Sequence, residues 1–131
     1  MCIRDSPECE LIGVEPAAAD DTRRSFAVGH PVRIAQPDTI ADGLAITAPG
    51  ERTFEINRHL VAEVVTVTDD QLVEAMRVGA RLLGRRFEPS GVAGLAAVLD
   101  DPDRWRGRRV GVILTGGNID AARFDDLTAT T

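Results

Sequence analysis

One stretch near the C-terminal end of the chain, residues 110–120, constrains the possible fold more than any other. Val110–Leu114 has no polar residue and no alternation, which is typical of a strand covered on both faces of a sheet. Thr115–Gly117 follows directly, so a polar, glycine-rich loop stands where an open α/β sheet binds small molecules, at the carboxyl end of a strand. Asn118 is placed to cap a helix after this loop. Alone, such a loop is more often a plain turn than a binding site.

Strand and helix patterns alternate along the rest of the chain. Residues 11–14 and 63–67 have the composition of buried strands, and Glu15–Pro16 is expected to end the first of them. Thr68 and Gln71 have the spacing of a capping box, which predicts that a helix begins there. Its apolar stripe is expected to comprise Leu72, Met76, Ala80, Leu83 and Phe87. Further helices are expected at residues 17–26, 54–61, 92–99 and after 120. This alternation predicts an α/β fold with three layers, a mostly parallel sheet with helices on both faces.

The composition excludes several classes of protein. The chain has 131 residues, enough for one domain with a single core, and its net charge of −6 argues against non-specific binding to nucleic acid. No apolar run has the length of a membrane span, and the first residues lack a signal-peptide pattern. Cys2 and Cys9 are too few for a disulfide framework, so we expect a reducing, cytoplasmic location. All 15 basic residues are arginine, so the chain supplies no lysine amine for covalent catalysis.

Carboxylates at two places are candidates for chemistry. Glu15 ends a strand and Asp21 lies in the following turn or helix, so the two side chains and a carbonyl between them could bind Mg²⁺ or Ca²⁺. Spacing alone favours the alternative, a solvated acidic start of a helix. Glu88 either ends a helix or points into a pocket, and spacing slightly favours the first reading. Ser90 is most simply the N-cap of the next helix.

Five segments of the chain, taken together, resemble one enzyme family in their order and spacing. The set is similar to the C-terminal part of threonine ammonia-lyases (threonine dehydratases) and serine racemases. These are pyridoxal-phosphate enzymes with the tryptophan-synthase-β-like fold, fold type II. Each motif is weak alone, but the set is specific, and the resemblance covers residues 11–120. The segments are Gly13–Pro16 with Asp20–Asp21, Thr39–Gly43, Val65–Asp70, Phe87–Gly91 and Leu114–Asp120.

The resemblance implies a partial catalytic domain over residues 11–131, after an irregular N-terminus over residues 1–10. Met1–Ser6 is unlike the family and could be an artefact of the reading frame. In the family, the Schiff-base lysine, an asparagine beside the cofactor ring and a glycine-rich phosphate loop lie earlier in the chain. None is present here, so the resemblance implies a fragment that is inactive alone. The intact enzyme would be a homodimer that eliminates water from L-threonine or L-serine and releases a 2-oxo acid and ammonia.

The resemblance also implies roles for particular residues. Thr115 would hydrogen-bond the pyridine nitrogen of the cofactor, where many relatives have serine or cysteine. Gly43 and Glu88 would line the cofactor ring. A divalent-cation site, with Mg²⁺ or Ca²⁺, would be formed by the Glu15 carboxylate, the Ala19 carbonyl and the Asp21 carboxylate.

Two alternatives stay open at this point. A serine racemase or a 3-hydroxyaspartate dehydratase would share the same motifs, and the loop that binds the substrate carboxylate and could distinguish these enzymes lies outside the chain. A non-catalytic α/β domain that binds a small ligand would use the backbone amides of Thr115–Gly117 to hold an anion. The missing lysine favours such a domain over an active enzyme for this chain in isolation, whereas the ordered motifs favour the fragment.

Overall fold

The computed structural model describes residues 8–129, and the expectation for Met1–Ser6 lies outside them. Its sheet consists of two parallel strands, β1 (Ile12–Pro16) and β2 (Glu63–Val67), with Ile12 opposite Glu63 and Pro16 opposite Val67. Both strands lie where the sequence predicts them. However, β1 ends at Pro16 and not before Glu15. Each strand of the pair has a free edge, and proline is tolerated on such an edge.

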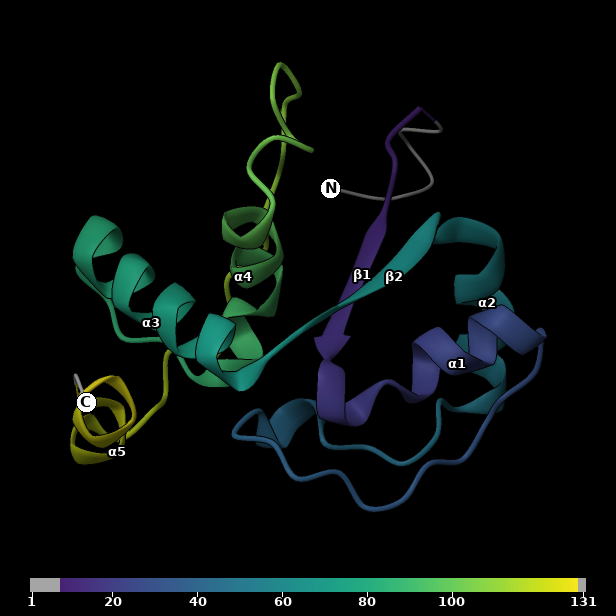
Figure 1. Ribbon diagram of the computed structural model, residues 1–131, viewed down its shortest axis with the longest axis horizontal. Coiled ribbons are helices and arrows are strands. Elements are labelled where there is room, and N and C mark those ends of the chain that lie inside the picture. The colour runs from purple at the N-terminus through teal and green to yellow at the C-terminus, as the bar shows by residue number, and fades with distance from the viewer. Residues whose placement is uncertain (1–7, 130–131) are drawn as a thin grey trace.

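Helices pack against the sheet from two sides (Figure 1). α1 (Asp21–Val28) contacts β2, and with α2 (Glu51–Leu60) it lies on one side. α4 (Ala93–Asp100) contacts both strands and, with α3 (Asp69–Leu83), lies on the other side. The predicted α/β fold with helices on both faces of a parallel sheet is therefore confirmed. Short 3₁₀ helices, η2 (Ala17–Ala19), η3 (Asp42–Leu44) and η4 (Pro89–Val92), connect these elements.

α3 begins as the sequence predicts and ends earlier. The Thr68 hydroxyl accepts a hydrogen bond from the Gln71 backbone amide, and the Gln71 side chain accepts one from the Thr68 backbone amide. The predicted capping box is therefore confirmed. Gly84, with φ of 64°, ends the helix in the left-handed conformation that glycine adopts readily. Leu83, the last residue of the helix, is 53% exposed, contrary to its predicted place in the buried stripe. Phe87 is buried but reaches the core from outside the helix.

The core lies mainly between α3, α4, η4 and the end of β2. Leu72 and Met76 of α3 are fully buried, as predicted. Residues 92–99 are nearly all small and apolar, which is typical of a helix buried on every side, but Leu99 is 40% exposed, because only one side of α4 meets the sheet and α3. The buried members of the core are Ala41, Val67, Leu72, Ala75, Met76, Phe87, Val92, Ala93, Ala96 and Phe124.

Val110–Leu114 is not a strand in the structure, contrary to the prediction. Val110 and Ile113 are 42% and 77% exposed, and only alternate residues such as Leu114 pack toward the core. Within residues 8–129, no strand lies beside this stretch to pair with its backbone, and a strand exists only as part of a hydrogen-bonded ladder. An apolar run indicates that a stretch is buried in a sheet, but it does not show that the neighbouring strands of that sheet lie beside it in this structure.

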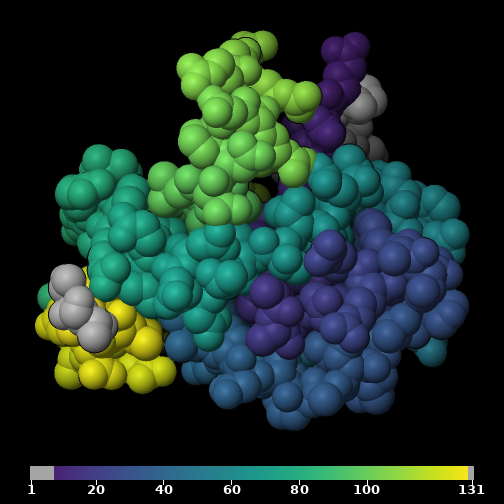
Figure 2. All heavy atoms as spheres, in the orientation of Figure 1, coloured from purple at the N-terminus to yellow at the C-terminus, as the bar shows by residue number. Residues whose placement is uncertain are grey.

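The two segments on either side of this stretch are well defined. Residues 101–109 form turns that project from the body of the molecule (Figure 2), and ion pairs of Arg104 with Glu63 and of Arg108 with Glu10 fasten them near the start of the sheet. After the stretch, α5 (Ala121–Thr128) is capped by Asp120 and not by Asn118 as predicted. The helix begins at residue 121, so only Asp120 reaches its first free amides. Between residues 8 and 129, no helix has the length and apolarity needed to cross a membrane.

Candidate functional site

The segment Glu88–Gly91 brings together two of the predicted cofactor contacts. The Glu88 amide donates a hydrogen bond to the Gly116 carbonyl at 2.7 Å, and the Thr115 amide donates to the Gly91 carbonyl at 3.3 Å. These bonds fix the loop of Thr115–Gly117 alongside η4, so Thr115 and Glu88, which are far apart in the sequence, belong to one site.

The third predicted contact, Gly43, joins the same site through Ser90. The Ser90 hydroxyl accepts the Gly43 amide at 2.9 Å. Ser90 was expected to cap the following helix, but that prediction is wrong. Ser90 lies inside η4, its hydroxyl is turned toward Gly43, and the N-cap position of the following helix α4 is occupied by Val92, which has no capping side chain. The structure therefore assembles Thr115, Gly43 and Glu88 around η4.

Glycines are required where these segments touch. Gly116 has φ of 67° and lies so close to Glu88 that a Cβ atom would collide with the carboxylate side chain. A Cβ atom on Gly91 would collide with the Thr115 backbone carbonyl. The glycines of the two motifs therefore serve close approach of one backbone to another, and they hold the loop at a fixed distance from η4.

The groups that remain accessible define the chemistry of this site. Thr115 is exposed, and its hydroxyl makes no hydrogen bond with the residues that the structure describes. The Glu88 side chain is half-buried and packs on Gly116. Gly43 is exposed and offers backbone without a side chain. A hydroxyl, a carboxylate and an exposed glycine backbone are group types that a small-molecule site can use to orient the ring of a ligand such as pyridoxal phosphate.

The predicted cation site has a different structure. Glu15 is 7% exposed, and its carboxylate accepts the Arg23 amide at 2.7 Å and the Thr22 amide at 3.3 Å. Glu15 thus caps the first turn of α1, where the helix dipole favours an anion. Burial raises the pKa of Glu15; the backbone bond from Arg23 offsets part of this effect, and the negative charge of Asp21 adds to it.

Asp21 is the second carboxylate of the predicted cation site. It is fully buried, and neither carboxylate oxygen has a hydrogen-bond partner among the described residues. Burial raises the pKa of Asp21, and the neighbouring charge of Asp20 raises it further. A buried carboxylate without a partner is costly, and a bound cation would remove that cost.

The predicted cation site has few donors, but they are of the right chemical type. Glu15 and Asp21 are buried carboxylates, and Ala19 between them is a buried residue with a backbone carbonyl; carboxylate and carbonyl oxygens are the ligand types that Mg²⁺ and Ca²⁺ prefer. Among residues 8–129, no group of three or more His, Cys, Asp or Glu side chains is placed to hold a metal. The site would therefore depend on the Ala19 carbonyl and on water for its remaining ligands.

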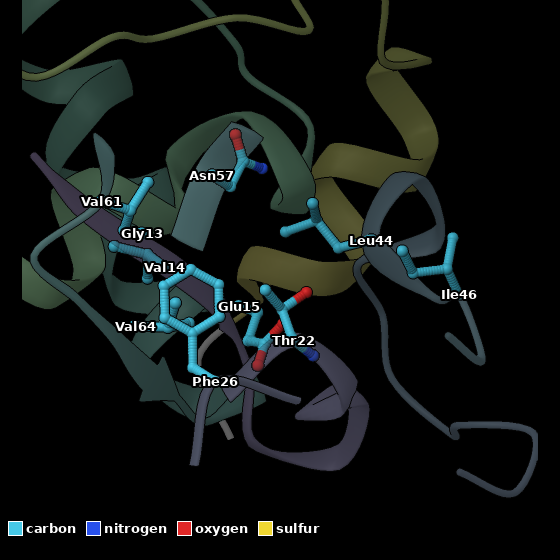
Figure 3. Close-up of a pocket in the computed structure, with 10 residues that line it drawn as sticks. All are labelled: Gly13, Val14, Glu15, Thr22, Phe26, Leu44, Ile46, Asn57, Val61 and Val64. Atoms are coloured by element: carbon cyan, nitrogen blue, oxygen red, sulfur yellow. The ribbon is translucent and has the colours of Figure 1, made fainter. Parts of the chain in front are cut away.

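A small pocket lies beside Glu15 (Figure 3). It has a volume of about 160 Å³ and opens between the sheet, α1, α2 and the chain after η3. Its walls are mostly apolar, with Phe26 and Leu44 facing each other across it and Glu15 and Thr22 at one side. The remaining lining residues are Gly13, Val14, Ile46, Asn57, Val61 and Val64. No pattern in the sequence indicated this pocket.

Sequence reasoning also missed the residues that hold the Gly43 loop. The Asp69 carboxylate accepts the Thr39 hydroxyl at 2.6 Å and the Ile40 amide at 3.1 Å. Both Thr39 and Asp69 lie in motifs that carry the family resemblance, and an acid at the start of a helix is normally explained by the helix dipole alone. A second use of Asp69 becomes visible only in three dimensions.

Glycine-rich loops gathered around a few polar groups in an α/β domain are compatible with a small-molecule site. The chain belongs to the family of pyridoxal-phosphate dependent enzymes, since the model of that family matches residues 2–116. The resemblance that the five motifs carry is thus confirmed.

Individual relatives agree with this assignment. The chain is 45% identical to an L-threo-3-hydroxyaspartate ammonia-lyase of Pseudomonas sp over 93% of its own length, and 36% identical to a serine racemase of Schizosaccharomyces pombe over 91%. Among solved structures, it resembles a threonine deaminase from T.th. (41% identity, TM-score 0.83, 88% of this chain and 39% of that one) and maize serine racemase (34%, 0.83, 94% and 40%). The chain spans 38% and 37% of the two curated relatives.

Proposed function

We propose that the intact protein containing this chain is a pyridoxal-phosphate-dependent ammonia-lyase that removes water from L-threonine or L-serine. The observation that supports this most is the convergence of Thr115, Gly43 and Glu88 on η4 through backbone and Ser90 hydrogen bonds. The activity is proposed for the whole protein, because the chain spans little more than a third of its relatives.

The residues of this chain would hold the cofactor and tune it. Pyridoxal phosphate, when bound, supplies an electron-withdrawing ring that makes the α-hydrogen of an amino acid acidic. The Thr115 hydroxyl would donate a hydrogen bond to the ring nitrogen while keeping its own proton, because a hydroxyl is a weak acid. Gly43 and Glu88 would flank the ring and exclude water from it.

We propose that Glu15, the Ala19 carbonyl and Asp21 bind Mg²⁺ or Ca²⁺ in the intact protein. The unpartnered, fully buried carboxylate of Asp21 is the main support for this site. Its position at the start of α1, separated from β1 by the short helix η2, indicates a structural role, in which the cation holds the connection between strand and helix.

A second candidate substrate is L-threo-3-hydroxyaspartate. Two relatives that are 45% and 41% identical to this chain are L-threo-3-hydroxyaspartate ammonia-lyases. This substrate shares the amino group and the β-hydroxyl with threonine and serine, so the same elimination applies to all three. A serine racemase is the third reading, supported by the 36% identical relative from Schizosaccharomyces pombe.

Purified intact protein should be supplied separately with L-threonine, L-serine and L-threo-3-hydroxyaspartate, and ammonia and 2-oxo acid should be measured. We expect both products in equal amounts, and the highest kcat/KM identifies the substrate. Formation of D-serine without ammonia would overturn the lyase in favour of the racemase. If the intact protein binds no pyridoxal phosphate, the result would support the alternative of a non-catalytic domain that binds a small ligand. The chain as printed, which has no lysine, should release no ammonia above free cofactor.

We also propose that the intact protein is a homodimer in the cytoplasm. A large apolar side chain of α3, Leu82, is 71% exposed, and such a residue favours burial against further protein. Light scattering on the intact protein tests the dimer.

A further inference from the structure

The loop that carries Gly43 is fastened at both of its ends by side chains from other parts of the chain. At its start, the Asp69 carboxylate accepts the Thr39 hydroxyl and the Ile40 amide, and Ala41, next along, is fully buried. At its end, the Ser90 hydroxyl accepts the Gly43 amide. Asp69 belongs to the first turn of α3 and Ser90 to η4, so two separate elements determine where the loop lies.

Each contact has features beyond ordinary packing. Gly43 is exposed, so its amide could bond water, yet it is turned toward Ser90. A Cβ atom on Gly43 would come within 3.0 Å of the Ser90 Oγ atom, which shows how closely the two residues approach. Asp69 uses both carboxylate oxygens on this one loop, although its neighbour Asp70 in the same turn is exposed and makes no such contact.

We propose that Ser90 and Asp69 are positioning residues for the cofactor site: they hold the Thr39–Gly43 loop so that Gly43 faces η4 at a fixed distance. The inference rests on the proposed function, since it assigns Gly43 to the cofactor ring. Neither side chain needs to touch the cofactor. Their effect is transmitted through the backbone of the loop, which makes cofactor binding depend on a hydroxyl and a carboxylate outside the ring contacts.

The test compares wild type with Ser90→Ala in the intact protein, by two readouts. The first is hydrogen exchange of the Gly43 amide, followed by NMR on protein labelled with ¹⁵N-glycine. We expect exchange to be roughly tenfold faster in Ser90→Ala, because the amide loses its acceptor. The second is the dissociation constant of pyridoxal phosphate from the cofactor-free protein, which we expect to rise about two- to tenfold, the equivalent of one hydrogen bond.

Further variants separate positioning from folding. Ser90→Thr keeps the hydroxyl and should restore both readouts. Asp69→Ala should weaken cofactor binding in the same range, whereas Asp70→Ala, in the same turn but without contact to the loop, should not. Thr53→Ala removes a hydroxyl that bonds its own helix start at Gly50, and it serves as a control for a general loss of stability.

The outcomes are distinct. Unchanged Gly43 exchange in Ser90→Ala overturns the inference, whatever the cofactor does. Faster exchange with an unchanged cofactor dissociation constant also overturns it, because the loop would then move without consequence. An equal loss of affinity in Asp69→Ala and Asp70→Ala, or in Thr53→Ala, assigns the effect to folding and overturns it as well. If wild type binds no pyridoxal phosphate, the proposed function fails, and Gly43 exchange still decides whether Ser90 holds the loop.

Discussion

The two candidate sites of this chain differ in how far the chain itself completes them. Around η4, backbone hydrogen bonds join the Glu88–Gly91 segment to the Thr115–Gly117 loop, the Ser90 hydroxyl accepts the Gly43 amide, and Gly91 and Gly116 are packed against a carbonyl and a side chain. At the start of α1, the Glu15 carboxylate is satisfied by two amides, but Asp21 is fully buried with both oxygens unpartnered among the described residues. The η4 region is therefore held in place by its own contacts, whereas the start of α1 holds a buried carboxylate that the described residues do not compensate.

This difference predicts opposite sensitivities. A region held by close backbone contacts tolerates no added volume and is indifferent to salt or metal ions. A region built around buried carboxylates tolerates changes of shape better, and its free energy depends on protons and cations. Variants of each kind can therefore show whether the two sites are as different as their contacts indicate.

The largest effect is expected from Gly91→Ala. The new Cβ atom would collide with the Thr115 carbonyl, which is backbone and cannot rotate away, so the free energy of unfolding should fall by about 3 kcal/mol. Urea denaturation measures this change. Gly111→Ala is the matched control, since a Cβ atom there meets nothing within 4 Å, and its effect should stay within about 0.5 kcal/mol. Equal losses in both variants would contradict the close contact at η4.

Asp21→Asn should have the next largest effect, and its sign should depend on the cation. In chelator, removal of a buried unpartnered charge should raise the free energy of unfolding by about 1–3 kcal/mol. With Mg²⁺ or Ca²⁺ present, wild type should gain stability from binding, and the variant should lose that gain. Thermal melts with and without the ion measure both. Asp70→Asn, an exposed acid, should show neither change.

The same region should show a pH dependence of known sign. Burial raises the pKa of both Glu15 and Asp21, so the folded protein binds protons more tightly than the unfolded chain. Stability should therefore decrease as the pH rises from the ordinary carboxyl value of about 4 through the raised folded pKa values. We expect this decrease in chelator, a smaller one in Asp21→Asn, and little of it with saturating cation. Stability that rises with pH over this range would contradict the burial of uncompensated carboxylates.

The sequence predicts local elements of this fold better than their surroundings. The Thr68–Gln71 capping box and β2 follow from a few adjacent residues, and both were found where the sequence places them. The prediction of a strand at Val110–Leu114 was wrong, because an apolar run indicates burial but not pairing, and within residues 8–129 neither β1 nor β2 pairs with this stretch. Local chemistry fixes a helix start, whereas strand formation is decided by what lies beside it.

The candidate site shows the same limit. The family motifs indicated Thr115, Gly43 and Glu88, but nothing in their spacing shows that Ser90 joins Gly43 to η4. A serine before a helix is favoured as a cap, but the Ser90 hydroxyl accepts the amide of Gly43, which lies 47 residues earlier. The sequence gives no sign that the Asp69 carboxylate binds the Gly43 loop, for the same reason.

A smaller effect is expected at Thr115, where the η4 region meets the cofactor. Thr115→Ala should weaken pyridoxal phosphate binding to the intact protein by about 0.5–1.5 kcal/mol, the value of one hydrogen bond. Thr115→Ser keeps the hydroxyl and should be nearly silent. Fluorescence titration of the cofactor-free protein measures both. Equal affinity in wild type and Thr115→Ala would show that the hydroxyl does not face the ring nitrogen.

The smallest effect should come from Val61→Ile, which probes whether the pocket connects the two regions. Val61 lines the pocket of about 160 Å³ beside Glu15, and the opposite wall includes Leu44, the residue after Gly43 (Figure 3). One added methylene should fill part of this space and raise the free energy of unfolding by about 0.8 kcal/mol, with cation and cofactor affinities unchanged. Chemical denaturation and the two titrations measure this. If the filled pocket changes the affinity for the cation and for the cofactor together, the pocket couples the carboxylate region to the Gly43 loop. The two sites would then be parts of one cooperative unit, and the contrast between a geometric site and an electrostatic one would hold only for their immediate contacts.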